Sequence, residues 1–112
     1  MDGAALSGIQ AGTLATRWRG RALLKSPFDL ALYMQAIDRE RPATIIEIGT
    51  HEGGSAVWFA DMMQAVGLAP RVVSVDIGGC ELADPRISLL RGDARALGAV
   101  LTPGVLAALP RP

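Results

Sequence analysis

An apolar segment that runs directly into a glycine-rich turn constrains the fold of this chain more than any other feature. Residues 44–48 read Thr-Ile-Ile-Glu-Ile, and residues 49–55 read Gly-Thr-His-Glu-Gly-Gly-Ser. A β-branched apolar run is typical of a parallel strand that is covered on both faces. Glycines let the backbone turn sharply and approach a ligand closely. The segment therefore predicts a central parallel strand, then a ligand-binding turn, then a helix.

A second apolar strand is predicted one helix later, over residues 71–77, and it ends in an acid, Asp76. Ligands of open α/β sheets bind outside the carboxyl ends of the strands, so Gly49 and Asp76 should face one crevice. An acid at the end of this strand is typical of a group that binds ribose hydroxyls. Plain termination of the strand is the alternative interpretation.

The spacing of the turn separates three loop chemistries. The dinucleotide fingerprint G-x-G-x-x-G fails because His51 stands where the second glycine is required. The phosphate loop G-x-x-x-x-G-K-[ST] fails because Ser55 stands where the lysine is required. The pattern that remains, E-x-G-x-x-x-G-G-S, is one residue roomier and begins at Glu47. It suits a cofactor with a sulfonium and an amino-acid tail better than one with phosphates.

These motifs resemble the Rossmann-like methyltransferases that use S-adenosylmethionine, and within them the cephalosporin hydroxylase and rhamnosyl O-methyltransferase family. The similarity runs from Trp18 to Asp93 and includes the order W-x-G, K-x-P-x-D, Y and P before the first strand. The chain is similar to the N-terminal portion of such an enzyme. The resemblance implies an α/β fold of three layers, α/β/α, with a mainly parallel sheet in the strand order 3-2-1-4-5. We expect this fold to be truncated after strand three, which leaves one edge of strand one open.

The resemblance also implies a set of cofactor-binding residues. Glu47 would organise the loop and meet the amino group of the methionine moiety, directly or through water, because an ionised carboxylate in an apolar strand is otherwise costly. The three glycines of the turn would admit the cofactor or merely make a tight turn. Ser55 is first of all an N-cap, and Asp93 would either approach the adenine amino group or cap a helix. The complete set is Glu47, Gly49, Gly53, Gly54, Ser55, Asp76 and Asp93.

Patterning divides the chain into an N-terminal extension, residues 1–25, and the N-terminal half of a methyltransferase domain, residues 26–112. Ser26 and Pro27 predict the start of a helix that ends before Pro42. Its apolar stripe and the inward face of the next helix, residues 55–66, predict the core. The stripe is Leu30, Met34 and Ile37, and the inward face is Ala56, Phe59, Ala60 and Met63.

The pattern after the second strand is less regular. A third strand is predicted at residues 87–90 and a helix at residues 93–101, broken by Pro103 and Gly104. The last stretch, residues 105–112, is apolar and ends in proline. It has no repeat or linker character.

Composition excludes several classes of protein. Lys plus Arg and Asp plus Glu both number 11, so the chain has no net basic field to hold nucleic acid. The single Cys80 cannot form an internal disulfide, and no apolar run approaches the roughly 18 residues that a membrane helix needs. The N-terminus lacks the basic and apolar regions of a secretory signal. We expect a cytoplasmic protein without a membrane span.

Three further residues have ordinary interpretations beside functional ones. His51, a possible general base by its position, is expected to be a solvent-facing loop residue, and Cys80 an ordinary free thiol. One histidine and one cysteine predict no zinc site. Trp18, among three arginines, is expected at a surface or oligomer contact rather than a nucleic-acid stacking patch. A homo-oligomer therefore stays open.

The expected function is S-adenosylmethionine-dependent O-methylation of a hydroxyl on a small molecule, glycan or glycolipid, in lipid or secondary-metabolite biosynthesis. The catalytic residues stay unassigned, and a divalent metal such as Mg, if one takes part, would be bound by residues beyond this chain. Two alternatives stay open. One is a degenerate or truncated module that only binds or assembles, and the other is a dinucleotide-dependent oxidoreductase with an unusual loop.

Overall fold

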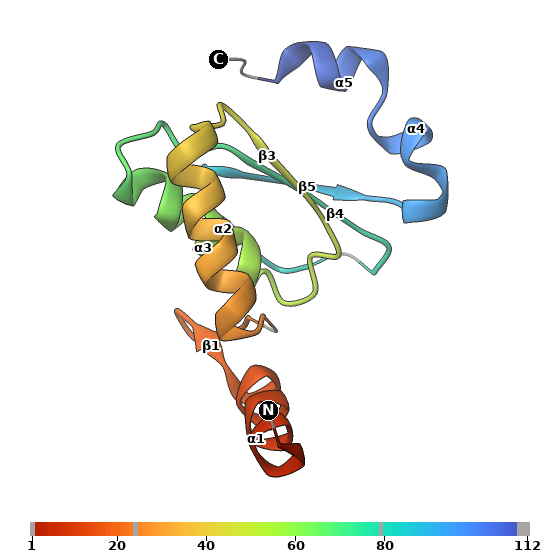
Figure 1. Cartoon of the computed structure of the whole chain (residues 1–112). Helices are drawn as coiled ribbons and strands as arrows, with labels where there is room; N and C mark the ends of the chain where they lie inside the picture. The colour runs from red at the N-terminus through yellow and green to blue at the C-terminus, as the bar shows by residue number, and fades with distance from the viewer. Residues whose placement is uncertain (1, 24, 79, 110–112) are drawn as a thin grey trace.

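A three-stranded parallel sheet forms the centre of the computed structural model, which describes residues 2–23, 25–78 and 80–109. Its strands are β3 (Ile45–Ile48), β4 (Val72–Asp76) and β5 (Ile87–Arg91), and β4 lies in the middle (Figure 1). Ile45 of β3 is level with Val72 of β4, which is level with Ile87 of β5. The three predicted strands and their parallel pairing are confirmed.

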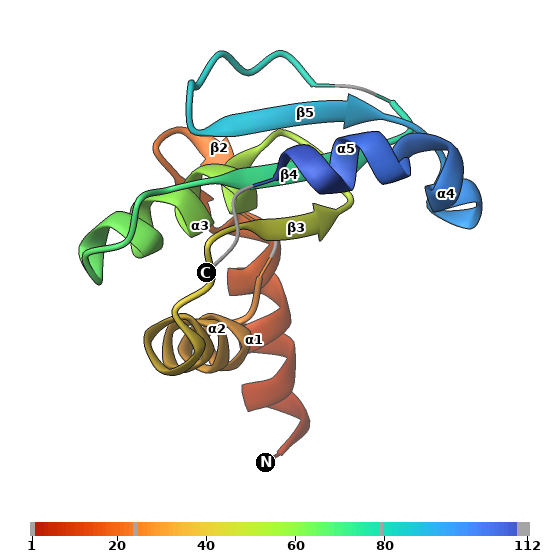
Figure 2. The ribbon, with the colours of Figure 1, turned by 90° about the horizontal axis from the view of Figure 1, so that it is seen from above.

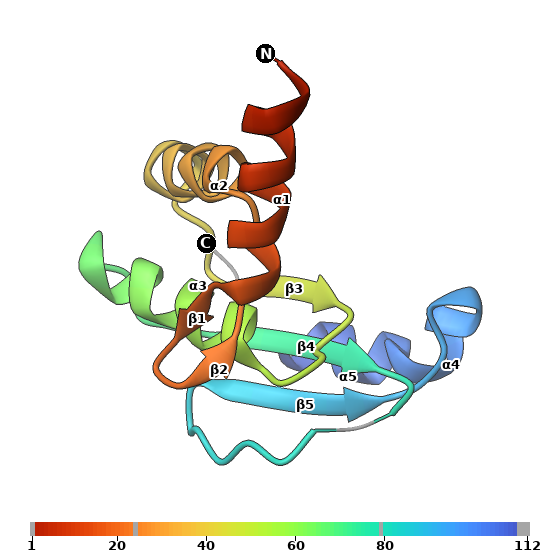
Figure 3. The same ribbon diagram turned by 90° about the horizontal axis from the view of Figure 1, so that it is seen from below.

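Helices cover both faces of this sheet. α3 (Gly54–Ala65) packs on one face, and α5 (Pro103–Ala108) lies on the other, as the views from above and below show (Figure 2 and Figure 3). α2 (Pro27–Glu40) runs beside the β3 edge and contacts α3. The predicted three-layer, Rossmann-like α/β architecture is therefore confirmed.

α3 supplies more of the buried apolar side chains than any other element of the described chain. Its predicted inward residues are all buried, together with Val57 and Trp58. The N-cap of α3 is Gly53, with φ of 87°, so the prediction that Ser55 is the N-cap is wrong. Ser55 instead lies within the first turn of α3, and its hydroxyl donates a hydrogen bond to Glu47 of β3.

α2 follows its sequence signals at the start but not along its whole length. Ser26 accepts a hydrogen bond from the Asp29 amide, and Pro27 is the first helical residue, as predicted. Of the predicted stripe, Ile37 is buried, Leu30 is half-buried and Met34 is 50% exposed. The prediction for Met34 is wrong because an open groove separates α2 from α3 on its side.

The burial predicted for β3 is also wrong. We expected both faces to be covered, but Ile46 is 42% and Ile48 is 54% exposed. Val73 and Val75, which are level with them on the same face of β4, are each 1% exposed. The cover over this face therefore reaches β4 and stops short of β3, which has only one strand neighbour among the described residues.

The predicted N-terminal extension has structure of its own. α1 (Gly3–Ala15) is capped by Asp2 and points away from the body of the molecule (Figure 1). A hairpin of β1 (Arg17–Trp18) and β2 (Arg21–Ala22) follows. Its two turn residues, Arg19 and Gly20, both have positive φ, which is the geometry of a tight hairpin turn.

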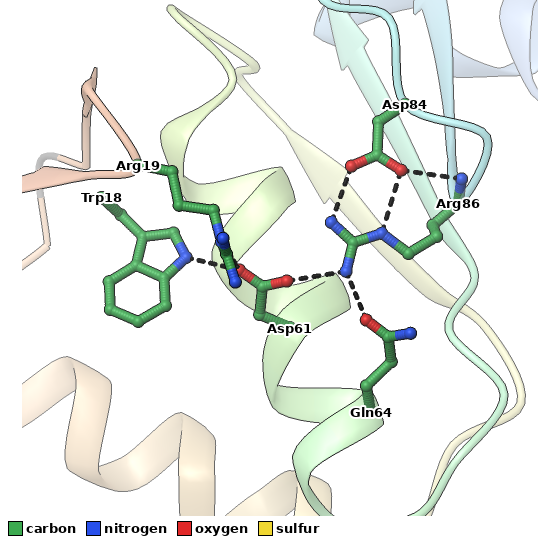
Figure 4. A network of polar contacts seen from close by, with 6 residues as sticks. All are labelled: Trp18, Arg19, Asp61, Gln64, Asp84 and Arg86. Carbon is green, nitrogen blue, oxygen red and sulfur yellow. Dashed lines mark hydrogen bonds and ion pairs between the residues drawn. The ribbon is translucent and has the colours of Figure 1, made fainter.

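A polar network fixes this hairpin to α3 (Figure 4). Asp61 of α3 accepts hydrogen bonds from Trp18 Nε1 at 2.8 Å and from Arg19 Nε at 2.5 Å. It also accepts one from Arg86 Nη1 at 2.7 Å, and Arg86 binds Asp84 at 2.6 Å. Trp18 is half-buried against the core, and its expected role at a surface or oligomer contact stays a prediction.

The segment after β5 is helical in short pieces. A 3-10 helix, η1 (Ala94–Ala96), and α4 (Leu97–Val100) occupy the helix predicted over residues 93–101. Pro103, expected to break that helix, is the first residue of α5, and Thr102 caps it by accepting from the Val105 amide. Proline is tolerated there because the first helical amide has no partner inside the helix.

Candidate functional site

A cleft of about 280 Å³ lies at the carboxyl ends of the three strands. Gly49 follows β3, Asp76 ends β4 and Asp93 lies just after β5, so each strand contributes one of the predicted site residues. The prediction that Gly49 and Asp76 face one crevice is confirmed. The lining consists of Ile48, Gly49, Val75, Asp76, Ile77, Gly92, Asp93 and Arg95.

Gly49 is the glycine of the turn whose backbone is open to this cleft. Its φ is 92°, a conformation that residues with a side chain rarely adopt, and no heavy atom lies within 4 Å of the position that a Cβ would take. A ligand can therefore approach the Gly49 backbone closely.

The other two glycines of the turn are required by packing within the protein. A Cβ on Gly53 would lie 2.9 Å from Leu82 Cδ2 and 3.3 Å from Cys80 Sγ. A Cβ on Gly54 would overlap the backbone carbonyl of Ala22. Neither residue lines the cleft, so the structure does not bring Gly53 and Gly54 together with Gly49 and Asp76.

Glu47 and Ser55 lie beneath the turn rather than in the cleft. Glu47 is 8% exposed and accepts hydrogen bonds from Ser55 Oγ at 2.6 Å and from Ser74 Oγ at 2.8 Å. The Ser74 proton is used in this bond, so Thr50 Oγ1, 2.7 Å away, donates to Ser74. Thr50 at the start of the turn and Ser55 after it are thus tied to one carboxylate. This arrangement fits the expectation that Glu47 organises the loop.

Thr50 and Ser74 are members of this network that were not identified from the sequence. The sequence signal for them is Ser74, a hydroxyl residue in the middle of the apolar strand β4. The Ser74 side chain is fully buried, so its hydroxyl requires a hydrogen-bond partner. A second buried polar residue on the neighbouring strand, Glu47, was the natural candidate.

The pKa values of the two carboxyl groups, Glu47 and Asp76, are shifted in opposite directions. Burial raises the pKa of Glu47, against the lowering effect of the Ser55 and Ser74 hydrogen bonds and of the Lys25 charge. The His51 amide donates to Asp76 Oδ2 at 2.8 Å, and this bond is the main reason that the pKa of Asp76 is lowered. Asp76 is therefore ionised at neutral pH and is a strong hydrogen-bond acceptor at the cleft.

Asp93 lines the cleft and also caps a helix, whereas His51 and Cys80 have the ordinary roles expected of them. Asp93 caps η1 by accepting from the Arg95 amide at 2.8 Å, and its carboxylate pairs with the Arg95 guanidinium at 2.6 Å. Asp93 therefore has the helix-capping role that was the alternative to a contact with adenine. His51 is an exposed loop residue, as expected, and Cys80 is a free thiol whose pKa is raised by burial.

Two kinds of feature are missing from residues 2–23, 25–78 and 80–109. No three His, Cys, Asp or Glu side chains lie close enough together to hold a metal ion. No helix in these ranges is long and apolar enough to cross a bilayer.

Comparison with known proteins gives consistent results. The family described as rhamnosyl O-methyltransferase/CmcI matches residues 11–89. The rhamnosyl O-methyltransferase of Mycobacterium leprae (strain TN) is 40% identical over 70 residues, which are 62% of this chain and 30% of that protein. The protein of the same name from Mycobacterium bovis (strain BCG / Pasteur 1173P2) is 37% identical over 71 residues, 63% of this chain and 29% of that protein.

Solved structures of CmcI resemble this fold. An apo structure has a TM-score of 0.75 and 30% identity, over 88% of this chain and 43% of that chain. A structure described as Mg-SAM has a TM-score of 0.70 and 29% identity, over 87% and 41% of the two chains. One described as SAH has a TM-score of 0.65 and 34% identity, over 70% and 43%. The chain thus spans about 30% of the length of the curated relatives and less than half of the solved chains.

Proposed function

This chain belongs to the rhamnosyl O-methyltransferase/CmcI family, and on that premise we propose that it binds S-adenosylmethionine in the cleft at the ends of β3, β4 and β5. The observation that carries the proposal is the meeting of the open Gly49 backbone with the ionised Asp76 carboxylate in one cleft. CmcI structures of the same fold are described as carrying SAM or SAH.

The residues of the cleft fit the nucleoside part of this cofactor. Asp76 would accept hydrogen bonds from the ribose hydroxyls, as a strand-end acid does in related sheets. Ile77, which follows it, is 62% exposed and offers an apolar surface for the adenine ring. The open backbone at Gly49 would let the cofactor lie across the turn. When bound, S-adenosylmethionine supplies an electrophilic methyl group, and the residues seen here bind and orient it.

For the whole protein we propose methyl transfer to a hydroxyl of a small molecule, glycan or glycolipid, in lipid or secondary-metabolite biosynthesis. The names of the relatives support a glycan acceptor. One CmcI structure is described as Mg-SAM, but the described residues of this chain contain no metal-binding group, so ligands for magnesium would have to come from elsewhere. A cytoplasmic location is part of the proposal.

Calorimetric titration with S-adenosylhomocysteine tests the proposal. We expect the wild-type chain to bind, and Asp76→Ala to bind about tenfold to more than a hundredfold more weakly, because a charged hydrogen bond contributes about 1.5–3 kcal/mol. Asp38→Ala is the matched control, since Asp38 is an exposed acid of α2 that does not line the cleft. It should bind as the wild type does.

Two results would contradict the proposal. Equal binding by Asp76→Ala and wild type, with both folded by circular dichroism, would exclude Asp76 as the ribose-binding residue. Binding of a nicotinamide dinucleotide in place of S-adenosylhomocysteine would instead support the oxidoreductase alternative.

A further inference from the structure

The β1–β2 hairpin contacts the glycine turn on a side that does not line the proposed cofactor cleft. Glu52, in the middle of the turn, makes both polar contacts. Its Oε2 accepts from the Ala22 amide at 2.8 Å, and its backbone carbonyl accepts from Arg21 Nη1 at 2.7 Å. Next to them, the Ala22 carbonyl lies so close to Gly54 that any side chain there would overlap it. The hairpin and the turn therefore meet without a gap.

The hairpin is itself firmly held. Trp18 and Arg19 donate to Asp61 of α3, and Leu23, which follows β2, is 3% exposed in the core. The hairpin is therefore held by α3 and the core in addition to its contacts with the turn. Glu52 is the residue through which this fixed hairpin reaches the turn.

The turn needs such a support because three of its residues have positive φ, a conformation that persists only where surrounding contacts hold it. Gly49 and Gly53 have positive φ, and His51 between them also has a positive φ of 53°. Without restraint these positions adopt several conformations, and a ligand that selects one of them loses affinity to the ordering. The bonds of Thr50 and Ser55 restrain the two ends of the turn, and those of Glu52 restrain its middle.

We propose that Glu52 is a positioning residue for cofactor binding, which couples the β1–β2 hairpin to the turn so that docking of the hairpin and binding of the cofactor favour each other. The inference rests on the proposed function. Glu52 does not line the cofactor cleft. It lines a separate polar cleft of about 510 Å³ together with Arg21 and Glu81, so it acts through the turn.

The test compares three variants. Glu52→Ala removes the acceptor for the Ala22 amide. We expect its affinity for S-adenosylhomocysteine to fall by about tenfold or more. Glu52→Gln keeps an oxygen that can accept from Ala22 and should recover most of the affinity. Glu81→Ala, an exposed acid in the same polar cleft, is the matched control and should bind as the wild type does.

Amide hydrogen exchange provides a second readout that needs no cofactor. In Glu52→Ala, the amides of residues 49–54 should exchange faster than in the wild type. Coupling is reciprocal, so S-adenosylhomocysteine should in turn slow exchange of the Ala22 amide in the wild type. Arg21→Met, which removes only the bond to the Glu52 carbonyl, should shift both readouts in the same direction by less, and it replaces Glu52→Ala if that variant does not fold.

Specific results would overturn the inference. One is a Glu52→Ala variant whose melting temperature falls while its affinity stays at the wild-type value, which would show a purely structural contact. Another is unchanged exchange of the turn. A wild-type chain that binds no S-adenosylhomocysteine, but whose turn exchanges faster in Glu52→Ala, would contradict the proposed function and support the positioning of the turn by Glu52.

Discussion

The residues of the glycine-rich turn have different structural roles although they belong to one motif. Gly49 is open to the cleft, whereas Gly54 meets the backbone of the hairpin. Glu47 lies below the turn and Asp76 beside the cleft, so the two acids serve the loop and the cleft separately. Residue type alone does not distinguish these duties.

The contact at Gly54 predicts a loss of stability on substitution. Gly54→Ala should lower the free energy of unfolding by about 1–3 kcal/mol, because the added methyl group overlaps the Ala22 carbonyl, which moves only if the hairpin moves. Gly8→Ala is the control. Gly8 lies inside α1 with open space around it, and alanine there should add about 0.5–1 kcal/mol. Urea unfolding measures both, and an unchanged free energy of unfolding in Gly54→Ala would contradict the close packing of Gly54 against Ala22.

Glu47 predicts a pH dependence of stability. Burial raises the pKa of Glu47 above its ordinary value of 4.5 in the folded chain, whereas the unfolded chain keeps the ordinary value. Between the two values the folded chain binds more protons, so the free energy of unfolding falls as pH rises through this window. The charges that face Glu47 are those of Lys25 and Asp76.

The comparison that isolates this effect is urea unfolding of the wild type and Glu47→Gln at several pH values above 4.5. The glutamine variant cannot ionise, so its stability relative to the wild type should increase with pH through the window. A difference that stays constant with pH would show that Glu47 has the same pKa in the folded and unfolded chain.

Among the elements, α3 is the one that joins the hairpin to the sheet. Its Asp61 accepts hydrogen bonds from Trp18 and Arg19 on one side and from Arg86 on the other (Figure 4). Arg86 also pairs with Asp84 just before β5. One acid on one helix thus connects segments from the N-terminal hairpin to the last strand.

Arg86 is therefore predicted to contribute strongly to stability. Arg86→Met would leave the carboxylates of Asp61 and Asp84, which are 10% and 13% exposed, without their main partner. We expect a loss of about 1.5–3 kcal/mol in the free energy of unfolding. Arg95→Met is the control, because the Arg95 side chain is 87% exposed and its pair with Asp93 should contribute little. Equal losses in the two variants would contradict the prediction.

The same network predicts that the folded chain loses stability at low pH. The Arg86 hydrogen bond lowers the pKa of Asp84. Partial burial raises that of Asp61, but hydrogen bonds from Arg86, Arg19 and Trp18 outweigh burial and lower it. The stabilisation is complete above the unfolded value of 3.8 and is lost as pH falls below it. Thermal unfolding at decreasing pH should show a steep loss in the wild type and a shallower one in Arg86→Met.

At the scale of the whole molecule, one edge of β3 has no strand neighbour among residues 2–23, 25–78 and 80–109. Ile45 and Gly49 donate their amides to Arg71 and Val75 on the β4 side. Amides alternate in direction along a strand, so those of Ile46 and Ile48 face the open edge. Unpaired edges favour pairing with another chain. A second copy fits, because two identical edges related by a two-fold axis satisfy each other.

We therefore expect the isolated chain to self-associate through β3. Sedimentation velocity should show a concentration-dependent species, and the amides of Ile46 and Ile48 should gain protection from exchange as concentration rises. Ile46→Lys should favour the monomer by placing a charge at the edge, whereas Leu32→Lys, on an exposed position of α2, should not. A monomer at all concentrations, with both amides strongly protected, would show that this edge is already satisfied.

The sequence determined the elements that depend on neighbouring residues. The strands β3, β4 and β5, the capped start of α2 and the turn at Gly49 all arise from periodicity, caps and glycines that act over a few positions. The parallel order and the shared cleft of Gly49 and Asp76 followed from the alternation of strands and helices. α1 and the hairpin were not predicted because two-residue strands have no period and because α1, which points away from the body of the molecule, has no apolar stripe.

Tertiary structure alone decided which of these residues face the cleft and which are buried beneath it. Gly54 depends on Ala22, Gly53 on Leu82, and Glu47 on Ser74, and each pair lies 27 or more residues apart in the sequence. The exposure of Ile46 and Ile48 likewise depends on a strand neighbour and a covering layer, neither of which a strand pattern reveals. Burial and hydrogen-bond partners are properties of pairs of elements, whereas local patterns report one element at a time.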